Sequence, residues 1–328
     1  MQPLWEVVGL LVVVLVAALL TAVARGYALR RQLLDQPGER RSHVVATPRG
    51  GGIAIVLTQL LACMCFGLLF PKAGGALAVF SAGLLLVAGI GWWDDHRPLP
   101  ALPRLGVHVL AGLLLAALVW QGTGDAYRSA FSALLAVGLI NVWNFMDGID
   151  GLAATQALLA AIAYGLLLPA PMAGLALVLA AGVLGFLPFN FPKARIFMGD
   201  VGSGALGYLL AGLVAAGLVT DSAPPVLLLL PLTAFLVDAG LTLAGRILRG
   251  ERWMEPHTRH LYQRWVKAGR SHVTVTSAYA LFAVAGGVLV WVCHRLPSPW
   301  DRAVALAWGA MAVALWFVLR NPSINKEA

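Results

Sequence analysis

Between two long apolar segments the chain reads Asn141-Val142-Trp143-Asn144-Phe145-Met146-Asp147-Gly148-Ile149-Asp150-Gly151. This stretch combines two carboxylates, two carboxamides and two glycines. An aspartate at the centre of a bilayer costs about 2.5–3.5 kcal/mol on insertion scales, so acids beside a spanning segment need a compensating function. The glycines allow the chain to leave a helix at its end, which would bring the four polar side chains to one side. The stretch therefore predicts one wall of a wet, charged site at a membrane surface.

The composition is that of an integral membrane protein. Of 328 residues, 60% are hydrophobic and 12% are charged, whereas soluble domains carry about 25% charged residues. Apolar runs long enough to cross a bilayer recur along the chain. They predict an all-α polytopic fold with ten or eleven transmembrane helices, in one domain covering residues 1–328. The expected spans lie near 3–23, 51–70, 76–92, 105–121, 129–143, 152–169, 172–189, 203–219, 225–245, 273–293 and 302–320. The first run lacks a basic leader and a small-residue cleavage site, so we expect a spanning helix there rather than a removed signal peptide.

The distribution of positive charge predicts the orientation. With eleven spans, alternate connections lie on opposite sides, and one set holds 19 of the 23 Lys and Arg residues. Cytoplasmic connections are enriched in Lys and Arg, so this set is expected to be cytoplasmic, with the N-terminus outside and the C-terminus inside. The same bias accounts for the net charge of +8 without nucleic acid as a partner.

Two polar clusters precede the opening stretch, on the same expected side. The first contains Arg40-Arg41-Ser42-His43 and Thr47-Pro48-Arg49-Gly50-Gly51-Gly52. It suits an anion cradle of basic side chains and exposed backbone N–H groups, or a basic topogenic loop with a flexible helix start. The second is Asp94-Asp95, directly after Trp92-Trp93. Adjacent acids can bind Mg²⁺ or share a proton; the alternative, a solvated helix end, is disfavoured by the helix dipole.

Three further polar features follow it. In Phe197-Met198-Gly199-Asp200-Val201-Gly202-Ser203, Asp200 suits a hard-cation ligand, or Asp200 or Ser203 is a helix N-cap. Asp238 lies well inside an apolar run, which indicates either a functional site or pairing with a buried Arg or a helix polar group. His257-Thr258-Arg259-His260 suits phosphate or sugar contacts, or a solvated basic loop. Zinc is disfavoured because no third ligand of matching type is nearby.

Apart from Asp238, these five clusters fall on the expected cytoplasmic face, while the outer loops are short and plain. This arrangement predicts an active site that handles a phosphorylated substrate with a divalent cation. The rival class is a transporter or lipid flippase of nucleotide-sugar or lipid-linked sugar. It would need polar residues at mid-depth, where only Asp238 clearly qualifies. A purely structural scaffold fits the convergent acids poorly.

Taken together, the motifs resemble those of the polyprenyl-phosphate N-acetylaminosugar-1-phosphate transferases, in the same order and over nearly the whole chain. The resemblance rests on the Asn…Asp-Gly-x-Asp-Gly stretch, the Gly-Asp-x-Gly-Ser motif, the paired acids and the late histidines. It implies a UDP-N-acetylaminosugar donor, undecaprenyl phosphate as acceptor and UMP as product. It also implies Mg²⁺, with Mn²⁺ as a substitute, and a bacterial cytoplasmic membrane location. A homodimer is left open.

The resemblance also implies roles for individual residues. The acids expected at the chemical step are Asp94, Asp95, Asp147, Asp150 and Asp200. The expected metal ligands are Asp200, Asp94 and Asp95. Asp94 and Asp95 would also lie near the lipid phosphate, with a role as base left open for one of them. Asn144, Asp147 and Asp150 would lie on the nucleotide and metal side, and Phe197 would stack on uracil. The substrate contacts expected in all are His43, Arg49, Arg104, Asn141, Asn144, Phe197, His257, Arg259 and His260.

Two departures bear on the sugar. The branch of this family that makes the first peptidoglycan lipid has three consecutive histidines in the late loop and a Lys after the paired acids. Here the loop reads His257-Thr258-Arg259-His260, and Arg97 and Arg104 follow the acids. We therefore expect a smaller sugar than MurNAc-pentapeptide, such as GlcNAc, FucNAc or QuiNAc, feeding O-antigen or another surface glycan. Arg259, Tyr262, Gln263 and Arg264 are expected to read that sugar.

Overall fold

The computed structural model describes residues 4–36, 45–252, 255 and 257–321. Within these ranges, nine helical segments are long and apolar enough to cross a membrane, and two shorter apolar helices lie among them. These segments correspond one to one with the expected spans, so the polytopic all-α fold is confirmed. His43 lies outside the described residues.

The helices and strands follow the order of the chain. The first half contains α1 (Leu4–Arg30), β1 (Leu34–Asp35), β2 (Thr47–Pro48), α2 (Ile53–Leu69), α3 (Pro71–His96), α4 (Ala101–Thr123), α5 (Ala126–Met146) and α6 (Leu152–Leu167). The second half contains α7 (Met172–Asn190), α8 (Asp200–Val219), α9 (Pro225–Leu228), η1 (Leu230–Leu232), α10 (Thr233–Leu248), α11 (Leu261–Lys267), α12 (His272–Cys293) and α13 (Trp300–Leu319). The strands β1 and β2 pair antiparallel.

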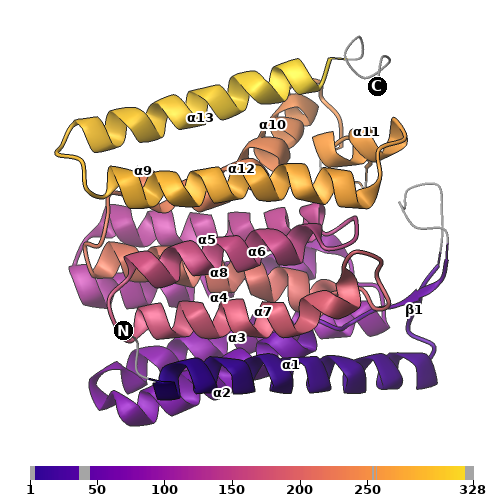
Figure 1. Cartoon of the computed structure of the whole chain (residues 1–328), viewed down its shortest axis with the longest axis horizontal. Helices are drawn as coiled ribbons and strands as arrows, with labels where there is room; N and C mark the ends of the chain where they lie inside the picture. The colour runs from indigo at the N-terminus through magenta and orange to yellow at the C-terminus, as the bar shows by residue number, and fades with distance from the viewer. Residues whose placement is uncertain (1–3, 37–44, 253–254, 256, 322–328) are drawn as a thin grey trace.

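Most of the long helices lie side by side with roughly parallel axes, with α1 and α2 at one edge and α12 and α13 at the other (Figure 1). Helix α8 packs against α3, α4 and α5 and is buried along nearly its whole length. Helix α1 leaves most of its apolar surface exposed, as expected for a helix that faces lipid. The core of the bundle is thus built around α8, whose first residue is Asp200.

Two helix boundaries and one short helix differ from the sequence prediction. Helix α3 continues to His96, so Asp94 and Asp95 lie in its last turn rather than in a loop. Helix α8 starts at Asp200 with Gly199 as its N-cap, so the N-cap assignment to Asp200 or Ser203 is wrong. The short helix α11 interrupts the long late loop; its seven residues are too few for a pronounced apolar period.

Glycines let α8 approach its neighbours at backbone distance. A Cβ atom on Gly207 would overlap the Leu139 carbonyl and the backbone of Ile140, in α5. A Cβ atom on Gly52 would overlap the backbone of Gly202. Small residues allow helices in a bilayer to come this close, which increases their dispersion contacts. These positions therefore fix how near α5 and the start of α2 lie to the central helix.

We expect Gly207→Ala to destabilise the protein and Gly89→Ala to leave it unchanged or slightly more stable. Both glycines are inside helices, but a Cβ atom on Gly89 would meet nothing within 4 Å. Replacing a glycine inside a helix by alanine increases the free energy of unfolding by up to about 1 kcal/mol. Overpacking lowers it by about 1–3 kcal/mol. Thermal unfolding in detergent measures the difference. Equal melting temperatures for the two variants would contradict the close packing of α5 on α8.

Candidate active site

The end of α3 and the start of α8 are joined by one buried carboxylate. Asp95 is 2% exposed, and its two oxygens accept hydrogen bonds from the backbone N–H groups of Asp200, at 3.0 Å, and Val201, at 3.1 Å. The first N–H groups of a helix have no partner within the helix and carry partial positive charge. Asp95 therefore caps α8 from another helix and fixes the position of Asp200.

The adjacent acid faces a different environment. One oxygen of Asp94 accepts the N–H of Leu99 at 2.6 Å, and the other accepts Nη1 of Arg104 at 2.8 Å. The same Nη1 atom donates to Asp200 at 2.6 Å. Asp94 and Asp200 are 15% and 30% exposed at their side chains. Two accessible carboxylates from different helices thus meet at one point, where a cationic group already sits.

Asp147 joins this cluster from the end of α5. Burial, and secondarily the nearby charge of Asp95, raise the pKa of Asp147 to about 7. The group is therefore divided between its neutral and ionised forms at neutral pH, and a cation beside it would favour the ionised form. Asn144, one helical turn earlier, donates to the hydroxyl of Ser203 in α8 at 3.2 Å. The opening stretch therefore contacts α8 through its middle residues.

The two outer polar residues of that stretch contact other elements. Asn141 donates to the Val137 carbonyl at 2.7 Å and lies 3.5 Å from Nδ1 of His108 in α4. Asp150 pairs with His272 at the start of α12, at 3.2 Å. The expectation that all four would line one wall is wrong, because the chain turns after Met146 and sends Asp150 toward α12.

The glycine run before α2 pairs with the segment before α8. Gly51 N–H donates to the Phe197 carbonyl at 3.0 Å, and Gly52 N–H to the Met198 carbonyl at 2.9 Å. These two N–H groups are therefore engaged within the protein and are not available to an anion. Phe197 is held in the same pairing, since its own N–H donates to the Pro48 carbonyl at 2.7 Å.

Arg49 brings positive charge next to Asp95 in the acid cluster. Its Nη2 donates to the Asp95 carbonyl, and its Nε lies 3.9 Å from the Asp95 carboxylate. A cavity of about 260 Å³ opens beside it between α1, α2 and α3. Its lining includes Leu20, Val23, Ala24, Ile53, Leu57 and Trp92 together with Arg49 and Asp95. The cavity therefore has an apolar wall and, at Arg49 and Asp95, a charged end.

The late histidines lie near the end of α5, close to Asp147. The rings of His257 and His260 lie 4.8 Å apart, and the ring of His260 is 6.3 Å from that of Phe145, two residues before Asp147 in the chain. Burial lowers the pKa of His257 to about 4, and burial also lowers that of His260. Both rings are therefore neutral at pH 7, which suits hydrogen bonds to hydroxyl or phosphate oxygens.

Arg259 is held by the loop itself. It donates to Glu251, which also accepts from Arg249 at 2.9 Å and from Arg246 at 3.2 Å. Hydrogen bonds from Arg249 and Arg259 lower the pKa of Glu251 to about 2, so this acid is ionised throughout the physiological range. The cluster gives the late loop a net positive edge.

The donor set fits a magnesium ion held in part by its substrate. In the described parts of the chain, no three His, Cys, Asp or Glu side chains form a metal cage. Mg²⁺ commonly takes only one or two carboxylates and completes its shell with water and phosphate oxygens. Asp94 and Asp200 can supply those ligands at the point where Arg104 meets both. Asp95 does not suit this role, since α8 occupies both its oxygens.

The structure gives structural contacts to two residues for which the sequence suggested a functional role. Tyr262, expected to read the sugar, is fully buried, and its hydroxyl donates to the Phe145 carbonyl at 3.0 Å. Asp238 accepts hydrogen bonds from α11, α12 and α13, which favours the pairing alternative. The sequence signal for Asp238 was an acid within an apolar run, which does not identify its partners. Tyr262 lies in a polar loop of the sequence, where no local signal predicts its burial.

Comparison with known proteins agrees with this geometry. Residues 77–218, which contain five of the acids described here, match the model of Glycosyl transferase family 4. The chain is 34% identical to decaprenyl-phosphate N-acetylglucosaminephosphotransferase of Mycobacterium leprae, over 79% of this chain and 77% of that protein. It is 30% identical to a probable undecaprenyl-phosphate N-acetylglucosaminyl 1-phosphate transferase of Bacillus subtilis, over 81% and 78%.

A more distant branch also matches. Phospho-N-acetylmuramoyl-pentapeptide-transferase of Moorella thermoacetica is 35% identical, over 63% of this chain and 74% of that protein. The Mycobacterium leprae and Bacillus subtilis relatives cover more of this chain than the Moorella thermoacetica protein does. With the ordered motifs, the acid cluster and similarities that cover 79% and 81% of the chain, it belongs to the polyprenyl-phosphate N-acetylaminosugar-1-phosphate transferases of Glycosyl transferase family 4.

Proposed function

We propose that this protein transfers an N-acetylaminosugar 1-phosphate from a UDP-sugar to undecaprenyl phosphate and releases UMP. The observation that carries the proposal is the meeting of Asp94, Asp200 and Arg104 at one accessible point. Opposed charges gathered there suit a diphosphate, whose negative charge must be neutralised before another phosphate can attack it. We place this end of the bundle at the cytoplasmic face of the bacterial inner membrane, because the basic connections lie there.

The reaction balances without an added acid or base. A phosphate monoester has a second pKa near 6, so the lipid phosphate is mostly a dianion at neutral pH. One of its oxygens attacks the β-phosphorus of the donor, the bond from that phosphorus to the bridging oxygen breaks, and UMP leaves with the electron pair. One diphosphate bond is lost and one is formed. The protein therefore contributes mainly positioning and charge compensation rather than proton removal.

The residues divide this work by location. Asp94 and Asp200 would hold Mg²⁺, which when bound neutralises phosphate charge. Arg104 would compensate charge on the diphosphate. Asn144 and Phe197 would orient the nucleotide, since both lie close to the start of α8.

The neutral rings of His257 and His260, with Arg259, would contact sugar and phosphate. A compact sugar such as GlcNAc or a 6-deoxy HexNAc is favoured because the loop reads His257-Thr258-Arg259-His260 and lacks the three consecutive histidines of the MurNAc-pentapeptide branch.

The acceptor has a plausible place beside the same acids. The cavity between α1, α2 and α3 has apolar walls and ends at Arg49 and Asp95. An isoprenoid chain requires an apolar wall, and its phosphate requires a cation at the end of that wall. Arg49 can supply this cation without leaving Asp95, because a guanidinium has five N–H donors.

The purified protein with Mg²⁺ should release UMP from a UDP-HexNAc only when undecaprenyl phosphate is added. A panel of UDP-GlcNAc, UDP-FucNAc, UDP-QuiNAc and UDP-MurNAc-pentapeptide, each with chromatographic detection of lipid product, identifies the sugar. Product formed in detergent, with no second compartment, separates a transferase from a transporter or flippase. UMP release that does not depend on the lipid, or release from none of the donors, would refute the proposal.

We expect Asp200→Asn to reduce turnover by about 100-fold or more, as is typical for loss of one group that stabilises developing charge. If Asp200 holds the ion, the apparent affinity for Mg²⁺ should fall in the same variant. A titration of initial rate against Mg²⁺ concentration measures both effects. An unchanged Mg²⁺ dependence would show that Asp200 is not a metal ligand.

Asp94→Asn and Asp95→Asn should differ in kind. Asp94 faces Arg104, so its amide variant should lose activity with little change in melting temperature. Asp95 caps α8, and loss of a cap costs about 1 kcal/mol, so its variant should lose stability as well as activity. Turnover and thermal unfolding measured side by side test this. Matching losses of both quantities in the two variants would contradict the separate roles.

A further inference from the structure

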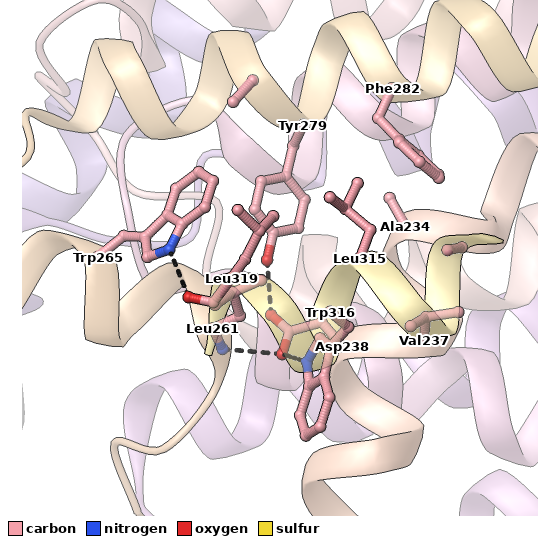
Figure 2. Close-up of a pocket in the computed structure, with 12 residues that line it drawn as sticks. Ala234, Val237, Asp238, Leu261, Trp265, Tyr279, Phe282, Leu315, Trp316 and Leu319 are labelled. Atoms are coloured by element: carbon pink, nitrogen blue, oxygen red, sulfur yellow. Dashed lines mark hydrogen bonds between the residues drawn. The ribbon is translucent and has the colours of Figure 1, made fainter. Parts of the chain in front are cut away.

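Asp238 anchors the part of the chain that faces the acid cluster from the late loop. It is 1% exposed within α10. Its carboxylate accepts hydrogen bonds from Leu261 N–H at 2.8 Å, the Tyr279 hydroxyl at 2.7 Å and Trp316 Nε1 at 3.1 Å (Figure 2). Buried charge is tolerated when several donors satisfy it. One acid thus joins the start of α11 to α12 and α13.

From this anchor, α11 reaches the turn that carries Asp147. The residue after Leu261 is Tyr262, whose hydroxyl donates to the Phe145 carbonyl at 3.0 Å. That carbonyl belongs to the last turn of α5, two residues before Asp147. A Cβ atom on Gly148 would overlap the same hydroxyl. Tyr262 therefore contacts the chain immediately before and immediately after Asp147.

A second contact closes the far end of the turn. The hydroxyl of Thr276 in α12 donates to the Asp150 carbonyl at 2.9 Å, and His272 pairs with the Asp150 carboxylate at 3.2 Å. Helix α12 is itself held to Asp238 through Tyr279. Both ends of the segment 145–150 are thus fixed by elements that share one buried anchor.

We propose that Tyr262 is a positioning residue for Asp147, which couples the late histidine loop to the acid cluster. The hydroxyl of Tyr262 holds the end of α5. Tyr262 also lies only two residues after His260, where the histidine loop ends. A displacement of α11 would therefore move His260 and Asp147 together. The proposal deepens the function proposed above and rests on it where turnover is the readout.

Tyr262→Phe removes one hydrogen bond and keeps the ring. Tyr164→Phe is the matched control, because Tyr164 is also fully buried and donates to a backbone carbonyl, that of Leu228, at 2.6 Å. A purely structural role predicts the same consequence for both variants, since such hydrogen bonds have similar net value. A positioning role predicts an effect on the Asp147 turn in Tyr262→Phe alone.

Two measurements on the full-length protein in detergent decide between these roles. We expect kcat of Tyr262→Phe to fall about tenfold while KM for the lipid acceptor changes less than threefold, because misplacement of a reacting group acts on the chemical step. We also expect amide hydrogen exchange over residues 144–152 to accelerate in Tyr262→Phe and to match the wild type in Tyr164→Phe.

Each result bears on one proposal. If exchange over 144–152 is the same in the two variants, or if their kcat values fall equally, Tyr262 does not position Asp147. If the wild-type protein releases no UMP from any donor, the proposed function fails. In that case the exchange measurement still decides whether Tyr262 holds the turn, because it requires no substrate.

Discussion

The geometry of the acid cluster depends on the cap that Asp95 places on α8. An ionised carboxylate this deeply buried would be costly without donors, and the two N–H groups at the start of α8 supply them. The helix dipole adds to the attraction. The interaction satisfies both partners and sets the distance between α3 and α8. It also places Asp94 and Asp200 on either side of Arg104. An acid that resembles a catalytic group in the sequence thus acts first as the support of the site.

Close backbone contacts between α3 and the start of α8 allow the Asp95 side chain to reach the N–H groups that it caps. Gly91 in α3 lies against the backbone of Asp200, where a Cβ atom would be 2.5 Å from the carbonyl carbon. Gly199 has a φ of +75°, a conformation that glycine adopts without the strain of a side chain. The N–H groups of Gly51 and Gly52 complete the backbone pairing at the same point. The glycines of the motifs therefore serve to bring charged groups together rather than to bind anions directly.

The site has two halves with different physical character. The first, formed by α3, α4, α8 and the end of α5, is rich in carboxylates and has accessible charge. The second, formed by the late loop and α11, has neutral histidines and an Arg and Glu cluster. A UDP-sugar also has two parts, an anionic diphosphate and a neutral sugar. The contact of Tyr262 with Phe145 is the place where the two halves meet, so their alignment depends on the packing of α11.

Most of the fold could be predicted from the sequence, and the reason is physical. A bilayer requires each span to satisfy its backbone within a helix, so length and hydropathy determine the spans. The expected spans were confirmed by the structure, whereas the orientation deduced from basic residues stays a prediction. The ordered motifs identified the family and predicted that Asp94, Asp200 and Arg104 belong to one site. These features are local or compositional, so they can be recognised in a single sequence.

Only the tertiary structure distinguished acids that look alike in the sequence. Asp94 and Asp95 are neighbours, but successive residues of a helix point about 100° apart, so one meets Arg104 and the other meets α8. Asp150 finds His272, and Asp238 finds donors in three later helices. Nothing near these acids in the chain encodes such partners. The sequence by itself determined that charge gathers at one end of a helical bundle, while packing decided which charges face a substrate and which hold the helices in place.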